Sequence, residues 1–286
     1  MWHFISDNIS HAIQQDFICD DIREVSGGDS HRAYKISDGR RRFFVKVDVA
    51  PQKESFDAEA HGLSLLHEAA HVRIPKVICT GSTQEHAYIV LEHLTLGDGE
   101  STDWREMGRQ LAKLHLHTES QYGCHFNNFI GRTRQINQWD TDWASFYSEH
   151  RIGTMLRMMA TNGIRFVNID SATQQIYNLL KGYQPEASLL HGDLWRGNVA
   201  FFKHTPVLFD PACYYGDRET DMAMTELFGP FPAAFYEGYR EVWPLSDCYQ
   251  QRRPVYQLYH LLNHALMFGG AYVTTAQETL KQLQKH

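Results

Sequence analysis

The chain has 286 residues, enough for one large domain or two coupled lobes around a sizeable core. Hydrophobic residues make up 43% and charged residues 21%, a composition typical of a folded globular protein and not of a disordered one. The formal net charge of −7 argues against a general nucleic-acid-binding protein, which needs a basic face to neutralise phosphates.

The sequence also argues against secretion and against a membrane span. The N-terminus lacks the basic start and apolar run of a signal peptide. A long stretch without Asp, Glu, Lys or Arg covers 255–277 and carries Gln257, His260, Asn263 and His264. We expect this stretch to be a buried helix that carries a few polar side chains, and not a membrane span. The five cysteines are scattered without a C-x-x-C pair, so we expect no disulfide framework, no zinc ribbon and a cytoplasmic location.

Strand-like runs concentrate at the start of the chain. Strands are predicted at residues 33–36, 43–47 and 88–91, the second of them a short apolar run. The first two flank a Ser-Asp-Gly turn signal, so they could pair as a hairpin. Apolar residues recur at helical spacing over 56–71, and Pro75 limits that helix.

Helical spacing dominates the rest of the chain. Helices are predicted at residues 104–114, 143–156 and 176–183, and again over most of the tail from Asp217. Two apolar runs, 199–202 and 207–209, flank a turn within this helical half. Gly97-Asp98-Gly99 offers a flexible joint. We therefore expect an α+β protein with a sheet-rich N-terminal lobe, residues 1–94, and a mainly helical C-terminal lobe, residues 95–286.

The segment Leu190-His191-Gly192-Asp193-Leu194-Trp195-Arg196-Gly197-Asn198 carries most of the chemical information. Asp210 follows at the end of an apolar run. Phosphoryl transfer from ATP needs a carboxylate that accepts the proton of the attacking hydroxyl, oxygen ligands for Mg²⁺, and a cation for the α- and β-phosphates. Asp193 suits the first role. Asn198 and Asp210 suit the second, because Mg²⁺ prefers oxygen ligands.

Lys46 suits the third role, the cation that binds the α- and β-phosphates. It lies inside an apolar run, where a lysine must pair with something, and Glu59 on the predicted helix could be its partner. Each residue alone has an ordinary interpretation, so the kinase hypothesis depends on their order and spacing together. Gly27 and Gly28 precede the first predicted strand and permit a backbone that approaches phosphates closely, although no G-x-G-x-x-G pattern is present and an ordinary turn would explain them alone.

With these residues the chain resembles the fructosamine kinase (ketosamine-3-kinase) family of protein-kinase-like small-molecule kinases. The resemblance extends over nearly the whole chain. The His-Gly-Asp motif with its Asn is shared with choline and aminoglycoside kinases. Trp195 and the Asp-Pro-Ala-x-Tyr-x-Gly-Asp-Arg-Glu stretch that starts at Asp210 favour the ketosamine group.

The resemblance implies a two-lobed protein-kinase-like fold with an antiparallel-sheet N-lobe and a helical C-lobe. It implies ATP- and Mg²⁺-dependent phosphorylation of the 3-hydroxyl of a ketoamine of the ribulosamine, erythrulosamine or fructosamine type. The 3-phosphate would destabilise the adduct, so the activity would act in protein deglycation repair. The acceptors would be small-molecule ketoamines or glycated protein lysines; the sequence does not choose between them and is silent on the oligomeric state.

The resemblance also implies roles for individual residues. Asp193 matches the proton acceptor, Asn198 and Asp210 match the metal ligands, and Lys46 with Glu59 matches the phosphate-binding pair. The inter-lobe segment whose backbone would meet adenine is Glu92, His93 and Leu94, and the aspartate that would brace the catalytic loop is Asp221. We expect Trp195 to contact the substrate, because an indole face packs well on the C–H face of a sugar-like chain. We expect His191 to brace the loop by hydrogen bonding, and Trp143 to fill the core.

Three alternatives remain open at this stage. A choline- or aminoglycoside-type kinase shares the catalytic motif. His67-Glu68-Ala69-Ala70-His71 is an H-E-x-x-H motif, which on a helix would hold zinc with Glu68 as the base of a hydrolase, although Pro75 follows closely and the extended zincin pattern is absent. A nucleotide-binding module without catalysis is opposed by the presence of the proton acceptor, both metal ligands and Lys46.

Overall fold

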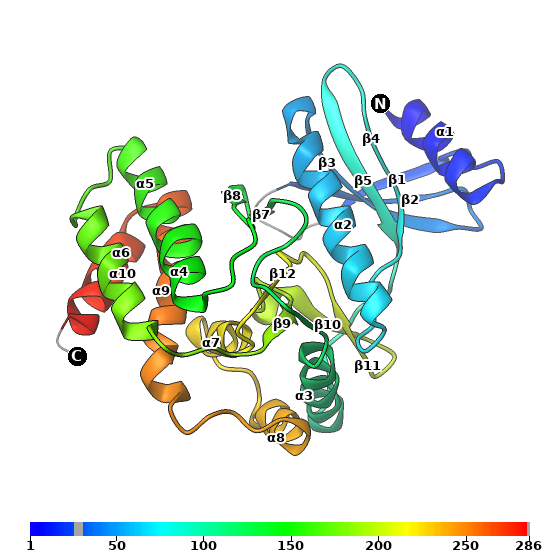
Figure 1. Ribbon diagram of the computed structural model, residues 1–286. Helices are drawn as coiled ribbons and strands as arrows, with labels where there is room; N and C mark the ends of the chain where they lie inside the picture. Colours follow the sequence, from blue (N-terminus) through cyan, green and yellow to red (C-terminus); the bar gives the residue numbers. More distant parts are fainter. Residues whose placement is uncertain (26–30, 285–286) are drawn as a thin grey trace.

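The computed structural model describes residues 1–25 and 31–284, so Gly27 and Gly28 lie outside the described residues. The N-terminal part contains a five-stranded antiparallel sheet with strand order β1-β2-β3-β5-β4 (Figure 1). Its strands are β1 (Asp21–Val25), β2 (Arg32–Ser37), β3 (Arg42–Val49), β4 (Val77–Ser82) and β5 (His86–Glu92). The three predicted strands are therefore confirmed as β2, β3 and β5, and the first two form the predicted hairpin.

Two helices cover opposite faces of this sheet. Side chains alternate along a strand, so Val45 and Val47 of β3 point to one face and pack with Ile5 and Ile9 of helix α1 (Trp2–Ile13). The other face packs against α2 (Lys53–Ala69), which follows the 3₁₀ turn η1 (Ala50–Gln52). Helix α2 corresponds to the predicted helix over 56–71, whereas α1 was not foreseen.

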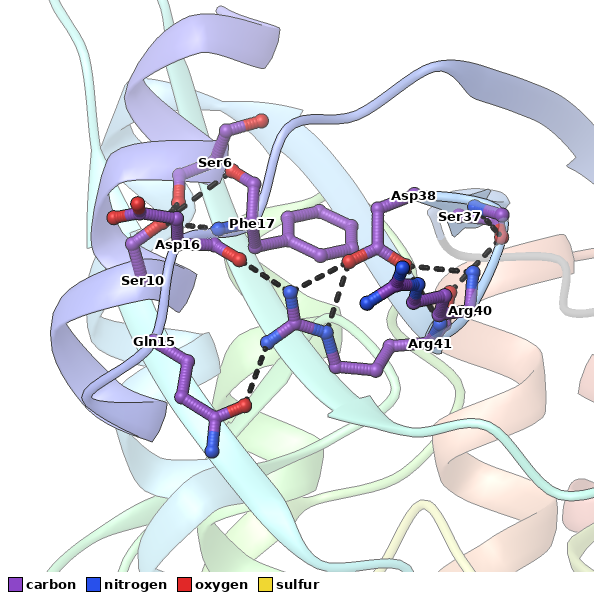
Figure 2. A network of polar contacts seen from close by, with 10 residues as sticks. Ser6, Ser10, Gln15, Asp16, Phe17, Ser37, Asp38, Arg40 and Arg41 are labelled. Carbon is purple, nitrogen blue, oxygen red and sulfur yellow. Dashed lines mark hydrogen bonds and ion pairs between the residues drawn. The ribbon is translucent and has the colours of Figure 1, made fainter.

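A polar cluster fastens the end of α1 to the sheet (Figure 2). Arg41, in the turn between β2 and β3, donates to the Asp38 carboxylate at 2.9 Å and to the side-chain oxygen of Gln15 at 3.2 Å. It also donates to the backbone oxygen of Asp16, which lies in the loop after α1. One guanidinium therefore fixes both the hairpin turn and the segment that enters β1.

The C-terminal part is mainly helical. Its helices are α3 (Ser101–His115), α4 (Trp143–Phe146), the π-helix η2 (Tyr147–Gly153), α5 (Thr154–Thr161), α6 (Ile169–Leu180), α7 (Glu219–Leu227), α8 (Ala233–Val242), α9 (Tyr249–Phe268) and α10 (Ala271–Leu283). Its short strands are β6 (Thr118–Glu119), β7 (Asn128–Ile130), β8 (Thr133–Gln135), β9 (Ala187–Leu190), β10 (Val199–Phe202), β11 (Thr205–Leu208) and β12 (Tyr214–Gly216). The predicted strand pair at 199–209 is confirmed as the β10–β11 hairpin.

Two helical predictions need refinement. The helix expected over 143–156 is formed by α4, η2 and α5, with wider π-type turns in its middle. The expectation of one helix over 255–277 is wrong, because Gly269 and Gly270 both take positive φ angles and separate α9 from α10.

None of the helices in the described residues is long and apolar enough to cross a membrane.

The main hydrophobic core is continuous across both parts of the chain. It contains Phe56 and Leu63 of α2 and Ile89 of β5, and it also contains Trp143 and Leu190 of the C-terminal part. Trp143 is fully buried, as expected. The antiparallel sheet and the separate helices confirm the α+β organisation. Because the two parts share one core, the division at residue 94 stays a prediction.

Candidate active site

A cavity of about 600 Å³ opens between the sheet and the C-terminal part. From the N-terminal part it is lined by His31, Ala33, Lys46, Ser55 and Glu59. From the C-terminal part it is lined by Asn128, Phe129, Gly131, Asp193, Trp195, Asn198, Asp210, Pro211, Phe228, Asn263, His264, Met267, Phe268 and Tyr272. The cavity therefore gathers six residues that the sequence singled out: Lys46, Glu59, Asp193, Trp195, Asn198 and Asp210.

Lys46 is the cation on the sheet side of this cavity. Because Val45 and Val47 face α1, Lys46 points to the opposite face of β3, where α2 brings Glu59. Its Nζ lies 2.7 Å from Glu59 Oε1 and 2.5 Å from Asp210 Oδ1. Burial alone would lower the pKa of Lys46, but the two carboxylates outweigh burial and raise it, so the ammonium group stays charged.

Asp193 and Asn198 lie together on the loop after β9. The Asn198 side-chain amide donates to the Asp193 backbone oxygen at 2.8 Å and to its carboxylate oxygen Oδ2 at 3.3 Å. The short 3₁₀ turn η3 (Arg196–Asn198) brings Asn198 back toward Asp193. Burial and the nearby charge of Asp210 raise the pKa of Asp193 to about 7. A carboxylate with a pKa near neutral pH accepts a proton more readily than an ordinary aspartate, which is what a general base needs.

His191 and Asp221 hold the same loop in place through hydrogen bonds. The Asp221 carboxylate accepts hydrogen bonds from the backbone N–H groups of His191 at 2.8 Å and Gly192 at 2.9 Å. The His191 ring donates from Nε2 to the backbone oxygen of Phe209 and accepts the Asp193 N–H at Nδ1. Burial lowers the pKa of His191, so the ring is neutral and can do both. The expected bracing by these two residues is confirmed.

Asp210 pairs with Lys46 across the cavity. It follows β11 with a φ of 55°, a left-handed conformation that a non-glycine residue rarely adopts and that often marks functional sites. This sharp turn directs its carboxylate toward Lys46, and 39% of the side chain stays exposed to the cavity. The oxygens of Asp210 and Asn198 lie in one cavity, and hard divalent cations prefer such donors.

Trp195 lines the same cavity as Asp193, two residues further along the loop. It is 40% exposed and lines the cavity. Its indole lies across Gly197, where any side chain would overlap the ring. The fold therefore presents the indole near Asp193 instead of burying it in the core.

The predicted adenine segment lies at the end of β5. Glu92 ends that strand, its carboxylate pairs with Arg73 at 2.6 Å, and its backbone N–H donates to the Lys76 oxygen. His93 and Leu94 follow it and are partly buried. Among the described residues that line the cavity these three do not occur, so their contact with adenine stays a prediction. The predicted phosphate-loop residues Gly27 and Gly28 lie outside the described residues.

Comparisons with known proteins show the family of this chain. A model of the fructosamine kinase family matches residues 1–286. A protein of Vibrio parahaemolyticus named a probable ketoamine kinase is 42% identical over 287 residues, covering 99% of both chains. A similarly named protein of Synechocystis is 44% identical over 283 residues, covering 98% of this chain and 96% of its own. This chain belongs to the fructosamine kinase family.

Solved structures place the family within a broader fold. A Haemophilus somnus protein named as a candidate fructosamine-3-kinase superposes with a TM-score of 0.95 at 33% identity, covering 99% of this chain and 97% of its own. A choline kinase of Streptococcus pneumoniae superposes with a TM-score of 0.65 at 15% identity, covering 99% of both chains, which shows the fold alone. The predicted protein-kinase-like fold is confirmed, and family membership makes the protein a phosphotransferase of the kinase type.

The zinc-hydrolase alternative is not supported by the fold of this family member. Helix α2 ends at Ala69 and Ala70 turns left-handed with a φ of 57°, so His71 leaves the helix that carries His67 and Glu68. The His71 ring instead lies 5.0 Å from the ring of His117. Within residues 1–25 and 31–284, no group of three or more His, Cys, Asp or Glu side chains is arranged to hold a metal ion.

Sequence reasoning missed the contribution of α9 to the site. His260 Nδ1 lies 4.0 Å from Asp193 Oδ1, and Asn263 lines the cavity one turn later. Burial lowers the pKa of His260 to about 3, so its ring is neutral and this contact is not an ion pair. The signal was present as polar residues at helical spacing in an uncharged stretch, and only the fold shows that this polar face meets Asp193.

Proposed function

We propose that the protein is an ATP- and Mg²⁺-dependent kinase that phosphorylates the 3-hydroxyl of a ketoamine. The supporting observation is the convergence of Lys46, Asp193 and Asp210 on one cavity in a chain of the fructosamine kinase family. The relatives named as ketoamine kinases favour a ketoamine as the acceptor. Small ketoamines and glycated protein lysines are both acceptors of this class, and we propose that the reaction occurs in the cytoplasm as deglycation repair.

Lys46 would hold the nucleotide phosphates. Glu59 keeps the ammonium group extended across the cavity, and the same group contacts Asp210, so phosphate and metal oxygens would meet beside it. Asn198 and Asp210 supply the oxygens that suit Mg²⁺. The ion, when bound with the nucleotide, neutralises charge on the β- and γ-phosphates.

Asp193 would orient the acceptor hydroxyl and take its proton. The hydroxyl oxygen then forms a bond to the γ-phosphorus as the bond to the ADP leaving oxygen breaks. Asn198 fixes the base through its hydrogen bonds to Asp193, and Asp221 fixes the backbone on which the base is carried. Trp195 would pack against the carbon chain of the acceptor. Catalysis of this kind depends on positioning and charge neutralisation.

An acceptor screen tests the proposal. ATP consumption is measured with Mg²⁺ and, separately, ribulosamines, erythrulosamines, fructosamines, choline and an aminoglycoside, and the product phosphate is located by NMR. We expect turnover of ketoamines with phosphate on O3 and loss of turnover with excess chelator. Turnover of choline or the aminoglycoside alone would reassign the protein to another acceptor, and binding of ATP without any turnover would favour a binding module.

A further inference from the structure

One face of α9 lines the acceptor side of the cavity. His260 lies nearest to Asp193, Asn263 and His264 follow one turn later, and Phe268 reaches the mouth with 54% of its surface exposed. A helix rises about 1.5 Å per residue, so this face leads about 12 Å from the catalytic carboxylate to solvent. A face of this length could contact an extended acceptor molecule along its path from solvent to Asp193.

The inner part of this face offers hydrogen-bond acceptors. Asn263 is 1% exposed, yet its Oδ1 has no hydrogen-bond partner within the described chain. His264 donates from Nδ1 to the His260 carbonyl, since a carbonyl only accepts, and its neutral ring therefore presents Nε2 as an acceptor. A buried acceptor without a partner costs free energy unless a ligand supplies a donor.

Toward the mouth, His264 and Phe268 of α9 meet Phe228, which follows α7, and Tyr272 of α10. We call these four rings the aromatic cluster. The His264 ring centroid lies 4.4 Å from that of Phe228, 5.2 Å from that of Tyr272 and 5.6 Å from that of Phe268. All four rings line the same cavity. Aromatic faces are electron-rich and attract cations.

Among the described residues that line the cavity, Lys46 is the only lysine or arginine. Lys46 lines the sheet side of the cavity and is already paired with Glu59 and Asp210. The acceptor side is lined by Asp193, by Asn263, whose buried Oδ1 has no hydrogen-bond partner in the described chain, and by aromatic rings. This combination suits a ligand that carries a positive charge and N–H donors on an organic chain.

We propose that Asn263 and the aromatic cluster form an amine subsite that binds the protonated nitrogen of the acceptor and leads its substituent out to solvent. The inference rests on the proposed function for the identity of the acceptor. A ketoamine carries its nitrogen on C1, close to the reacting C3 hydroxyl. With that hydroxyl at Asp193, the nitrogen reaches Asn263 and the substituent extends past Phe268. The open outer end admits the side chain of a glycated lysine as well as a small amine.

Binding of simple amines tests the subsite without turnover. Butylammonium and neutral butan-1-ol, which has the same number of heavy atoms, are titrated by calorimetry into the full chain saturated with Mg²⁺ and a non-hydrolysable ATP analogue. We expect butylammonium to bind at least about fivefold more tightly than butan-1-ol, and we expect Phe268→Ala and Tyr272→Ala to weaken butylammonium binding about fivefold. Phe268→Tyr, which keeps a ring, should retain the affinity. Phe4→Ala removes a ring that is 59% exposed on α1 and serves as the matched control.

Equal affinity for the amine and the alcohol, no binding of the amine, or insensitivity to Phe268→Ala would overturn the subsite. Turnover separates this failure from failure of the proposed function. If the wild-type protein phosphorylates no ketoamine but butylammonium binding still depends on Phe268, the subsite stands and the acceptor is a different amine. If ketoamines are phosphorylated but the amine selectivity is absent, the function stands and the subsite is wrong.

Asn263→Leu separates recognition from a structural role. Because Oδ1 is buried without a partner, an apolar side chain of similar size should leave the melting temperature unchanged or raise it. The same variant should lower the ratio of kcat/KM for a ketoamine to kcat/KM for the amine-free ketose by about fivefold or more. A fall in melting temperature with an unchanged ratio would assign Asn263 to the core and contradict the proposal.

Discussion

Lys46 and Asp210 lie 164 residues apart in the chain, yet Lys46 Nζ is 2.5 Å from Asp210 Oδ1. This contact joins the central strand of the N-terminal sheet to the turn after β11. Glu59 holds the same ammonium group from α2 at 2.7 Å. One buried cation therefore sets the distance between the two walls of the cavity.

Lys46→Met tests this relationship. The variant leaves Glu59 and Asp210 beside each other without their cation, so we expect the free energy of unfolding to fall by about 2 kcal/mol, a value discounted because Asp210 is partly exposed. Kinase activity should fall by about 10²-fold or more, because the phosphates lose their cation. Urea unfolding and steady-state kinetics measure the two effects.

The matched control is Lys35→Met, a lysine on the neighbouring strand β2. Adding Glu59→Gln to Lys46→Met should restore part of the stability but not the activity. Full activity in Lys46→Met would remove this lysine from the phosphate-binding site.

Asp193→Ala tests the proton acceptor. We expect kcat to fall by about 10²-fold or more, the low end of general-base effects, while the Kd for Mg²⁺–ATP changes little because Lys46, Asn198 and Asp210 remain. Stopped-flow turnover and calorimetric nucleotide titration separate these quantities. Near-normal kcat in this variant would show that another group takes the proton.

The raised pKa of Asp193 also predicts a pH dependence of stability. An ordinary aspartate titrates near 3.8, whereas burial and the charge of Asp210 raise the pKa of Asp193 to about 7 in the ligand-free chain. The folded chain binds more protons than the unfolded chain between these values, so stability falls as pH rises through the window. Asp193→Asn removes this loss.

We therefore expect Asp193→Asn to stabilise the ligand-free protein by roughly 2–4 kcal/mol at about pH 8 and by much less at about pH 4. Thermal unfolding in the presence of a chelator measures the difference. Asp247→Asn, at an exposed position, is the control. A stabilisation that does not grow with pH would contradict the raised pKa.

Much of the candidate site could be predicted because it depends on local periodicity. Alternation along β3 is enough to place Lys46 opposite Val45, and the predicted helix brings Glu59 to that face. The spacing of Asp193 and Asn198 fits a short turn that returns the amide to the carboxylate, and η3 is that turn.

The remainder depends on contacts that no local pattern encodes. The polar residues of α9 were visible in the sequence, but which element they face is decided by the packing of the whole C-terminal part. Ala70 takes a left-handed conformation where α2 ends, and this turns His71 away from the helix. The residue types around Ala70 do not predict this conformation. The Gly269-Gly270 pair is a helix-ending signal in the sequence, and it separates α9 from α10 within the stretch expected to form one helix.

Asp221→Asn tests how the loop that carries Asp193 is held in place. Both carboxylate oxygens accept N–H groups, from His191 and Gly192, and Oδ2 also lies 3.2 Å from His115 Nε2. Burial alone would raise the pKa of Asp221, but its partners outweigh burial and lower it, so the group is a carboxylate. An amide replaces one acceptor by a donor that faces another N–H.

We expect the Asp221→Asn substitution to cost about 2–3 kcal/mol of stability, the penalty for one buried donor left without a partner. The loop that carries Asp193 should also shift, so kcat should fall by about tenfold or more while KM for Mg²⁺–ATP stays near the wild-type value, because Lys46 is anchored by Glu59 instead. Asp170→Asn, on the exposed surface of α6, is the control. Asp221 acts through the loop and touches no reacting atom. Equal losses in kcat and nucleotide affinity would therefore indicate general destabilisation and not positioning of the base.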